Sequence, residues 1–175
     1  MIAAVVLAAG AGSRFGGPKQ ERLLPYVLRR LRDSAVDDVV VVLGAHRFAV
    51  EGARTVTCDD WALGPGASLR AGLVALTAET EAAVIVLADG PLLSPAAVDR
   101  VVDAWRAGTG AVVAASYGGV RGHPVCLGRD AWKRVPDAGG RGLAAVLVAC
   151  DDLGPPEDVD TADDLRRVEQ LLDDD

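Results

Sequence analysis

The sequence predicts a single α/β domain, residues 1–175, with a three-layer α/β/α, Rossmann-like, doubly wound and mostly parallel sheet. Two observations predict the sheet. Short apolar runs recur along the chain, and they are continuous rather than alternating, as in parallel strands buried on both faces. Stretches with helical spacing separate these runs, so right-handed crossovers are expected. A third observation, the length of 175 residues, fits one hydrophobic core.

Four apolar runs are the expected strands, and each is rich in Val, Ile, Leu or Ala: Ile2–Leu7, Val39–Leu43, Ala83–Leu87 and Ala111–Ala115. The segment Ser116–Leu127 predicts an added β-hairpin, because Gly118-Gly119 supplies a two-residue turn in its middle. There is no internal repeat or low-complexity tract that would divide the chain further. The sequence therefore predicts one sheet with a hairpin joined to it.

Helices are expected where apolar residues fall three or four positions apart. The first contains Leu24 and Leu31, and Pro25 is tolerable there only near its start. The second covers Ala67–Leu76, where the leucines lie on one stripe.

Two further helices have recognisable starts. Ser94-Pro95 predicts an N-cap followed by proline in the first turn. Near the end, Thr161 and Asp164 form a variant of the capping box and precede another apolar stripe. Both helices should therefore begin close to these residues.

Composition narrows the function classes. The net charge of −7 argues against a nucleic-acid surface, since phosphate binding requires clustered Lys and Arg. Cys58, Cys126 and Cys150 lie far apart without a CxxC pair, which suits a reducing compartment and gives no zinc site. The apolar opening stretch is too short for a membrane span, so we expect a cytoplasmic protein without a membrane partner.

The loop after the first strand carries the strongest chemical signal. In open α/β sheets, ligands bind beyond the carboxyl ends of the strands, and glycines let backbone N–H groups approach phosphates. A dinucleotide fingerprint would require Gly or Ala where Phe15 stands, and a P-loop does not fit Pro18-Lys19-Gln20. What remains is a Gly-rich turn with two cations, Arg14 and Lys19, which suits a nucleoside triphosphate.

Five segments, in order, carry a family resemblance: LAAGAGSRFGGPK at 7–19, DWALGPGASLRAGL at 60–73, LADGPL at 87–92, GHPV at 122–125 and DVDTADDL at 158–165. Together they resemble the nucleotidyltransferases related to the molybdenum-cofactor cytidylyl- and guanylyltransferases. The resemblance spans residues 2 to about 170 and implies a sheet of the nucleotide-diphospho-sugar transferase type.

This resemblance implies Mg²⁺ bound by Asp89 and Asp160, with Asp158 as an alternative to Asp160. Magnesium accepts a few carboxylates together with phosphate oxygens and water. The alternative for Asp89 is a structural aspartate in the turn before Gly90, and Asp160 could instead favour the dipole of the final helix.

The remaining site residues follow the same pattern. We expect Arg14 to contact the β- and γ-phosphates and Lys19 the α-phosphate, so that Arg14, Lys19 and Asp89 form the catalytic set. His123 is the expected acceptor-binding residue, although a histidine that fixes a turn would look the same. The expected nucleotide-binding residues are Leu7, Ala8, Ala9, Gly10, Gly12, Ser13, Gly66, Ser68 and Gly72, and for Gly72 close helix packing is the alternative.

Two departures from the family pattern bear on the site. Relatives carry a leucine-rich stretch and a Gly-x-Pro-Leu element after the lysine, whereas Lys19 here leads almost directly into the first helix. A true deletion there would change the placement of Lys19. Relatives also have Gly-Asp-Arg-Gly where this chain has Gly139-Gly140-Arg141-Gly142.

The predicted function is Mg²⁺-dependent transfer of a nucleoside monophosphate from CTP or GTP to a phosphorylated small molecule, first of all molybdopterin, with release of pyrophosphate. Ala8-Ala9-Gly10 and the Asp-x-Asp-Thr at 158–161 favour the cytidylyl branch. Phospholactate or a sugar or polyol phosphate are alternative acceptors, and a catalytically silent nucleotide-binding or regulatory module is the alternative class. A phosphatase-like hydrolase would need Asp-x-Asp on the first strand, where Leu7-Ala8-Ala9 stands.

Overall fold

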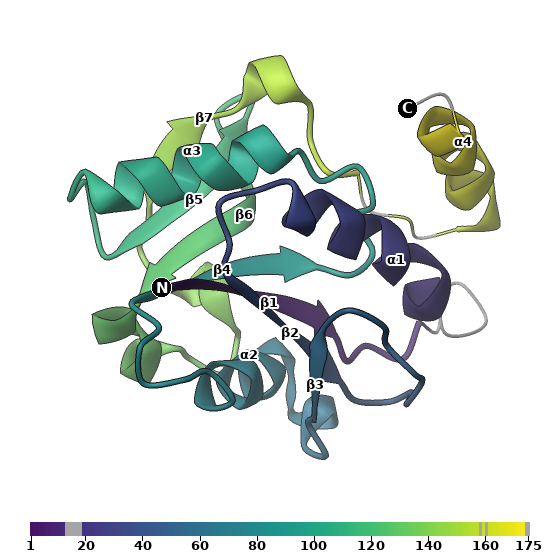
Figure 1. The fold of residues 1–175 in the computed structure, drawn as a ribbon, viewed down its shortest axis with the longest axis horizontal. Coiled ribbons are helices and arrows are strands. Elements are labelled where there is room, and N and C mark those ends of the chain that lie inside the picture. The colour runs from purple at the N-terminus through teal and green to yellow at the C-terminus, as the bar shows by residue number, and fades with distance from the viewer. Residues whose placement is uncertain (13–18, 158, 160, 174–175) are drawn as a thin grey trace.

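The computed structural model describes residues 1–12, 19–157, 159 and 161–173, and it shows one sheet between helices (Figure 1). The strands are β1 (Ile2–Ala8), β2 (Asp38–Leu43), β3 (Arg54–Thr57), β4 (Ala82–Leu87), β5 (Val112–Tyr117), β6 (Val120–Gly128) and β7 (Val146–Ala149). Their order across the seven-stranded sheet is β3-β2-β1-β4-β6-β5-β7. Only the pairings of β6, with β4 and with β5, are antiparallel among these strands, which confirms the mostly parallel sheet.

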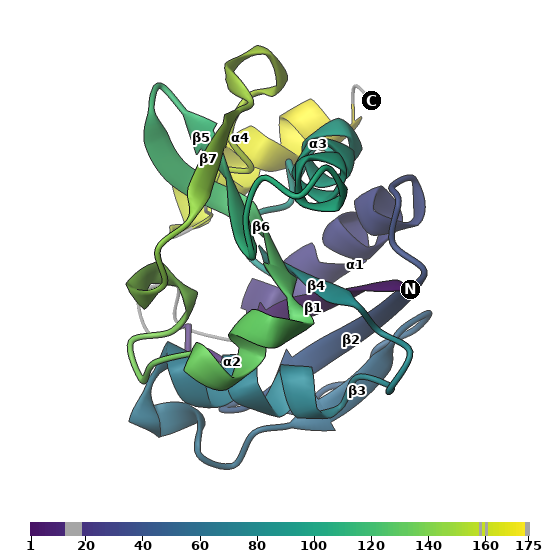
Figure 2. The same cartoon turned by 90° about the vertical axis from the view of Figure 1, so that its left-hand side faces the viewer.

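Helices cover both faces of the sheet (Figure 2). They are α1 (Lys19–Arg32), α2 (Pro65–Val74), α3 (Pro95–Arg106) and α4 (Ala162–Asp173). Helices α1 and α3 pack on one face, where Leu31 and Val101 are fully buried, whereas α2 packs on the other through Leu69 and Leu73. The three-layer α/β/α prediction is therefore confirmed.

The central strands are apolar throughout because both of their faces are covered. Along β1, Ala4 and Val6 join the core under α1 and α3, while Ala3 and Val5 join the core under α2. Successive side chains of a strand point to opposite faces, so a continuous apolar run serves two cores at once. This explains why alternation is absent from these runs.

The hairpin between β5 and β6 is confirmed, with Tyr117 opposite Val120 across the turn. Gly118 and Gly119 have φ angles of 58° and 75°, the left-handed region that a two-residue hairpin turn requires. The second strand of the hairpin lies inside the sheet, between β4 and β5.

Helix α1 begins earlier than its apolar stripe predicts. Its first residue is Lys19, so Pro25 lies inside the helix and cannot donate a backbone hydrogen bond to Glu21. Both Glu21 and Pro25 are exposed, so the proline lies on the face of the helix where a missing backbone donor is least costly. The short segment after Lys19 is thus part of α1 itself.

Helix α4 begins with the predicted capping box. The Thr161 backbone N–H donates to Asp164 Oδ2 at 2.9 Å, and the Asp164 backbone N–H donates to Thr161 Oγ1 at 3.2 Å. These bonds satisfy backbone donors that a helix start otherwise leaves unpaired. Within the described ranges, every helix falls short of the length and apolar character that a membrane crossing needs.

Candidate active site

The carboxyl ends of β1 and β4 bring the two strongest sequence signals together. Leu7 on β1 is in register with Leu87 on β4, and the Ala88 N–H donates to the Leu7 carbonyl at 3.1 Å. The Gly-rich loop leaves β1 at this edge, and Asp89 follows β4. This is the edge at which open α/β sheets bind ligands.

The described start of the Gly-rich loop is held from two sides. Gln20 Nε2, in the first turn of α1, donates to the Gly10 carbonyl at 3.3 Å. The His46 Nε2 atom, just beyond β2, lies 2.9 Å from the Ala11 carbonyl. Gly12 has a φ angle of 61°, a conformation that favours glycine. The predicted phosphate ligands Ser13 and Arg14 lie outside the described residues.

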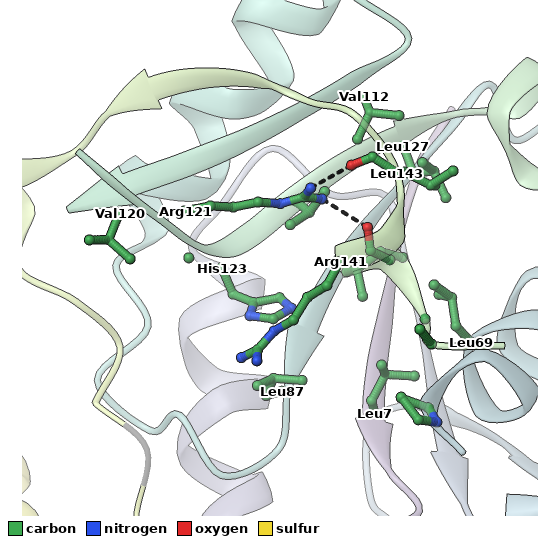
Figure 3. A pocket seen from close by; sticks show the side chains of 17 residues that line it. Leu7, Leu69, Leu87, Val112, Val120, Arg121, His123, Leu127, Arg141 and Leu143 are labelled. Carbon is green, nitrogen blue, oxygen red and sulfur yellow. Dashed lines mark hydrogen bonds between the residues drawn. The ribbon is translucent and has the colours of Figure 1, made fainter. Parts of the chain in front are cut away.

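A cavity of about 670 Å³ adjoins this edge on the α2 face of the sheet (Figure 3). Its apolar lining comes from α2, from the strands and from the segment around the 3₁₀ turn Gly140–Gly142, and includes Leu7, Leu69, Ile85, Leu87, Val125, Leu127 and Leu143. Its charged or titratable side chains are Arg121, His123 and Arg141. A mainly apolar pocket with a few polar groups is the usual form of a small-molecule site.

Arg121 ties β6 to the turn opposite. Its two terminal nitrogens donate to the Leu143 carbonyl at 2.6 Å and to the Gly140 carbonyl at 3.0 Å. Partial burial, and secondly the charge of Arg141, lower the pKa of Arg121 below its ordinary value. The two guanidinium groups are thus close enough to repel each other.

His123 lies on β6 and its ring lines the cavity (Figure 3). Burial lowers the pKa of His123 to about 4, and the charges of Arg141 and Arg121 act in the same direction, while Asp89 opposes them. The ring is therefore neutral near pH 7 and offers one donor and one acceptor. The Tyr117 hydroxyl donates to the His123 carbonyl at 3.0 Å and steadies the backbone there.

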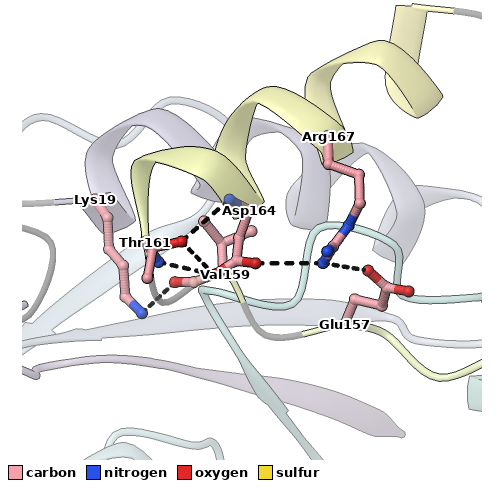
Figure 4. A network of polar contacts seen from close by, with 6 residues as sticks. All are labelled: Lys19, Glu157, Val159, Thr161, Asp164 and Arg167. Atoms are coloured by element: carbon pink, nitrogen blue, oxygen red, sulfur yellow. Dashed lines mark hydrogen bonds and ion pairs between the residues drawn. The ribbon is translucent and has the colours of Figure 1, made fainter.

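Lys19 and Asp89 meet at the carboxyl edge. Lys19 Nζ lies 3.0 Å from Asp89 Oδ2, and the Lys19 side chain is only 7% exposed. The same ammonium donates to the Val159 carbonyl (Figure 4). The Val159 N–H in turn donates to the Asp89 carbonyl at 3.0 Å. Three distant segments, the start of α1, the end of β4 and the chain before α4, are thereby joined.

The chain before α4 is itself anchored by polar contacts (Figure 4). Arg167 on α4 lies 3.1 Å from Glu157 Oε2 and 3.4 Å from Asp164 Oδ1, next to the Thr161 capping box. These contacts lie on the exposed side of the network. They support the segment that presents the Val159 carbonyl to Lys19.

One described carboxylate fits a magnesium ion at this edge. The Asp89 side chain is 26% exposed, and its oxygens are of the hard type that Mg²⁺ prefers. Asp160 and Asp158, the other predicted ligands, lie outside the described residues. In the described ranges, no three His, Cys, Asp or Glu side chains gather as a metal site would need. Asp89 is thus the described residue that fits Mg²⁺ at this edge.

Two of the predicted nucleotide-binding glycines have a packing reason. A Cβ on Gly66 would lie 2.7 Å from the Asp137 carbonyl oxygen, and one on Gly72 would lie 2.8 Å from Val42 Cγ2 and closer still to Val5. Gly72 thus shows the close helix packing named as its alternative. Nucleotide binding stays a prediction for the described members of the set: Leu7 beside the cavity, Ala8, Ala9, Gly10, Gly12, Gly66, Ser68 and Gly72.

Three side chains near the site were not among the predicted ones. Gln20 belongs to no motif, and its contact with Gly10 depends on where α1 begins. Arg121 and Arg141 reach the cavity from opposite sides, and only the tertiary structure brings them together. The Gly-Arg-Gly at 140–142 was the one available signal, because it stands where the family resemblance leads one to expect Gly-Asp-Arg-Gly.

Comparison with known proteins gives a family match over most of the chain. The profile of the MobA-like NTP transferase domain matches residues 4–153. The curated bifunctional protein GlmU of Maricaulis maris is 33% identical over 124 residues, a match that covers 63% of this chain and 27% of that protein.

Solved structures agree in fold. Rv0371c of Mycobacterium tuberculosis is 29% identical, with 97% of each chain covered and a TM-score of 0.75. A manganese complex of Rv0371c superposes equally well, at 28% identity, with 97% and 98% of the two chains covered and a TM-score of 0.75. Molybdopterin-guanine dinucleotide biosynthesis protein A of Archaeoglobus fulgidus has a TM-score of 0.66 at 17% identity, with 99% and 100% covered, a likeness of fold alone.

Proposed function

The chain belongs to the MobA-like NTP transferase domain family, and we propose that it transfers the nucleoside monophosphate of CTP or GTP to a phosphorylated small molecule, with release of pyrophosphate. Molybdopterin is the acceptor that we propose first. The observation that supports this proposal most directly is the 3.0 Å pair of Lys19 and Asp89 at the carboxyl edge, beside the Gly-rich loop.

The chemistry asks the protein mainly to position and neutralise charge. An acceptor phosphate oxygen attacks the α-phosphorus, the bond from this phosphorus to the bridging oxygen breaks, and pyrophosphate leaves with its negative charge. Lys19, at the start of α1, would contact the α-phosphate, where the helix N-terminus also favours negative charge. Arg14 would contact the β- and γ-phosphates.

Mg²⁺ is the proposed cofactor. Asp89 would hold it together with Asp160, and the metal would neutralise phosphate oxygens during transfer. The manganese complex of Rv0371c, a relative at 28% identity, supports a divalent ion in this family. Without a bound metal ion, Lys19 balances the charge of Asp89, because the two groups form an ion pair.

A nucleotide titration tests the first half of the proposal. Thermal and urea unfolding would be followed with CTP, GTP, ATP and UTP, each with and without Mg²⁺. A ligand at 100 times its dissociation constant adds about 2.7 kcal/mol to the free energy of unfolding. We expect this gain with CTP or GTP plus Mg²⁺, and its loss in Asp89→Asn. The control is Asp103→Asn, an aspartate that is 73% exposed on α3.

Turnover tests the second half. Pyrophosphate release would be measured with molybdopterin, phospholactate and a sugar phosphate as acceptors. We expect release with one of them, and a fall of at least about 100-fold in Lys19→Met, the size of effect seen when a donor to the developing charge is removed. Lys133→Met, at an exposed site, is the matched control. Nucleotide binding without release for any acceptor would favour a silent module, and binding of none of the four nucleotides would contradict the nucleotide site.

A further inference from the structure

The three polar side chains of the cavity differ in what they can offer to a negatively charged ligand. The cavity holds about 670 Å³ and its walls are largely Leu, Ile and Val. A cation at the edge of such a cavity attracts an anion that enters it, and this attraction holds even for Arg141, which is exposed to solvent. Which side chain carries a usable charge therefore decides how the cavity binds a ligand.

Arg121 is already committed to the protein. Both of its terminal nitrogens donate to backbone carbonyls, those of Leu143 and Gly140, at 2.6 and 3.0 Å. Turning this guanidinium toward a ligand would leave two carbonyl groups unpaired in a partly buried place, which costs free energy. Arg121 thus holds the turn in position rather than binding the ligand.

His123 contributes no charge near neutral pH. Burial lowers the pKa of its ring to about 4, with the two arginines adding to the effect. A neutral imidazole can hydrogen-bond to a ligand but cannot balance its charge.

Arg141 is the remaining cation. Its side chain crosses the cavity beside His123, and its guanidinium lies near Leu87 (Figure 3), two residues before Asp89. Among the described residues, none forms an ion pair or hydrogen bond with this guanidinium. It faces the like charge of Arg121, which lowers the pKa of Arg121, and a bound anion would relieve that repulsion.

We propose that Arg141 binds the anionic group of the acceptor and holds it in this cavity, next to the edge where Lys19 and Asp89 meet. This inference rests on the proposed function, because it assigns the acceptor to the same site. The apolar walls further imply an acceptor whose body is apolar or flat, since sugar or polyol hydroxyls would lose their hydrogen bonds to water there.

The test uses 1-naphthyl phosphate as a probe of this chemistry, with glycerol 3-phosphate as the polyol comparison. Binding would be measured by calorimetry on the whole protein, with Mg²⁺ and with α,β-methylene CTP or GTP filling the nucleotide site. We expect Arg141→Gln to weaken 1-naphthyl phosphate binding at least 10-fold, as expected for a lost charge-assisted hydrogen bond. Arg106→Gln, which is 51% exposed on the opposite face, should leave it unchanged.

Two comparisons make the result specific. Affinity for the nucleotide analogue should stay within about twofold in Arg141→Gln, and glycerol 3-phosphate should bind more weakly than the naphthyl ester. Unchanged probe binding, or a loss of nucleotide affinity instead, would overturn the role of Arg141. Equal binding of the two phosphates would overturn the apolar acceptor.

A further titration distinguishes failure of the proposed function from failure of the inference about Arg141. If neither nucleotide analogue binds, the probe is titrated against protein without nucleotide, in Arg141→Gln and in Lys19→Met. Loss of binding in Arg141→Gln alone would still support an anion site in the cavity, whereas loss in Lys19→Met alone would place the phosphate at the carboxyl edge and overturn the inference. The melting temperature of each variant, compared with that of Arg121→Met, separates a lost ligand from a damaged fold.

Discussion

His123 shows how a cavity changes the chemistry of one side chain. In water a histidine titrates near neutral pH, but burial among Leu and Val side chains, beside two arginines, lowers the pKa of His123 to about 4. The same residue type at His46 is partly exposed, and its Nε2 atom lies 2.9 Å from the Ala11 carbonyl. The two histidines of the chain therefore serve as a test position, His123, and a control position, His46.

We expect the stability of the protein to fall as the pH drops from about 6.5 to about 4, through His123. In this window the histidine binds a proton in the unfolded state but not in the folded state. Acid therefore stabilises the unfolded state and lowers the free energy of unfolding. A shift of this size corresponds to a loss of at most about 3 kcal/mol. Urea unfolding at a series of pH values measures it.

Carboxylates also titrate in this range, so the informative quantity is the difference between variants. His123→Gln should flatten the dependence on pH, because the neutral amide binds no proton in either state. His46→Gln makes the same substitution outside the cavity and is the matched control. Parallel curves for the original protein and His123→Gln would contradict the lowered pKa of His123.

At the scale of elements, Gly72 fixes how closely α2 approaches the sheet. A Cβ there would lie 2.8 Å from Val42 Cγ2 and nearer to Val5, on two neighbouring strands. Contacts this short force side chains or the helix to move. The glycine is thus needed for packing even if a nucleotide also passes nearby.

We expect Gly72→Ala to lower the free energy of unfolding by about 1–2 kcal/mol, since the overpacking cost exceeds the helical propensity that alanine adds. Val74→Ala, on the same helix and 85% exposed, should change it by less than about 0.5 kcal/mol. Urea unfolding measures both. Unchanged stability in Gly72→Ala combined with weaker nucleotide binding would instead assign the glycine to the ligand site.

Elements that bury a continuous face were predictable from sequence, and those at the margins were not. The strands β1, β2, β4 and β5 were expected because their apolar runs serve two cores. Helix α4 was expected from its capping box, and α3 from Ser94-Pro95 at its start, although the Ser94 side chain forms no cap hydrogen bond. Strand β3 was missed: its four residues are mostly exposed at the sheet edge, so its sequence has no apolar pattern. Strand β7 was also missed: its sequence is apolar, but it is only four residues long and lies at the other edge of the sheet.

The residues of the site also fall into two groups, those predictable from local motifs and those that depend on the tertiary structure. Lys19 and Asp89 follow the loop and the strand that position them, so local motifs were enough to place both at the carboxyl edge. The Val159 carbonyl could not be predicted, because a backbone group carries no sequence signal. The pairing of Arg121 with two carbonyls and the cavity that Arg141 enters both depend on how β6 lies between β4 and β5.

At the scale of the whole molecule, the elements differ in how large an apolar core they pack against. Strands β1 and β4 lie at the centre of the sheet and contribute to both large cores. Helix α4 instead rests on a small cluster of Leu23, Val159, Leu165 and Val168. Regions with few buried apolar contacts open at lower free energy than the core.

We therefore expect hydrogen exchange to show α4 opening well before the sheet. Amides of residues 162–173 should exchange at a lower free energy than those of residues 2–8 and 82–87, measured by mass spectrometry on peptides. Thr161→Ala removes the hydroxyl of the capping box and should lower the protection of α4 by about 1 kcal/mol while leaving β1 unchanged. Thr161→Ser keeps the hydroxyl and is the matched control.

This opening bears on the proposed nucleotide site, because the same segment presents the Val159 carbonyl to Lys19. If α4 opens separately, Thr161→Ala should loosen the Lys19 contact and weaken nucleotide binding modestly, with the melting temperature of the sheet little changed. If instead all peptides lose protection together and by the same amount, α4 belongs to one cooperative unit with the sheet. In that case the small cluster under α4 couples the start of α1 to the core more strongly than its four side chains suggest.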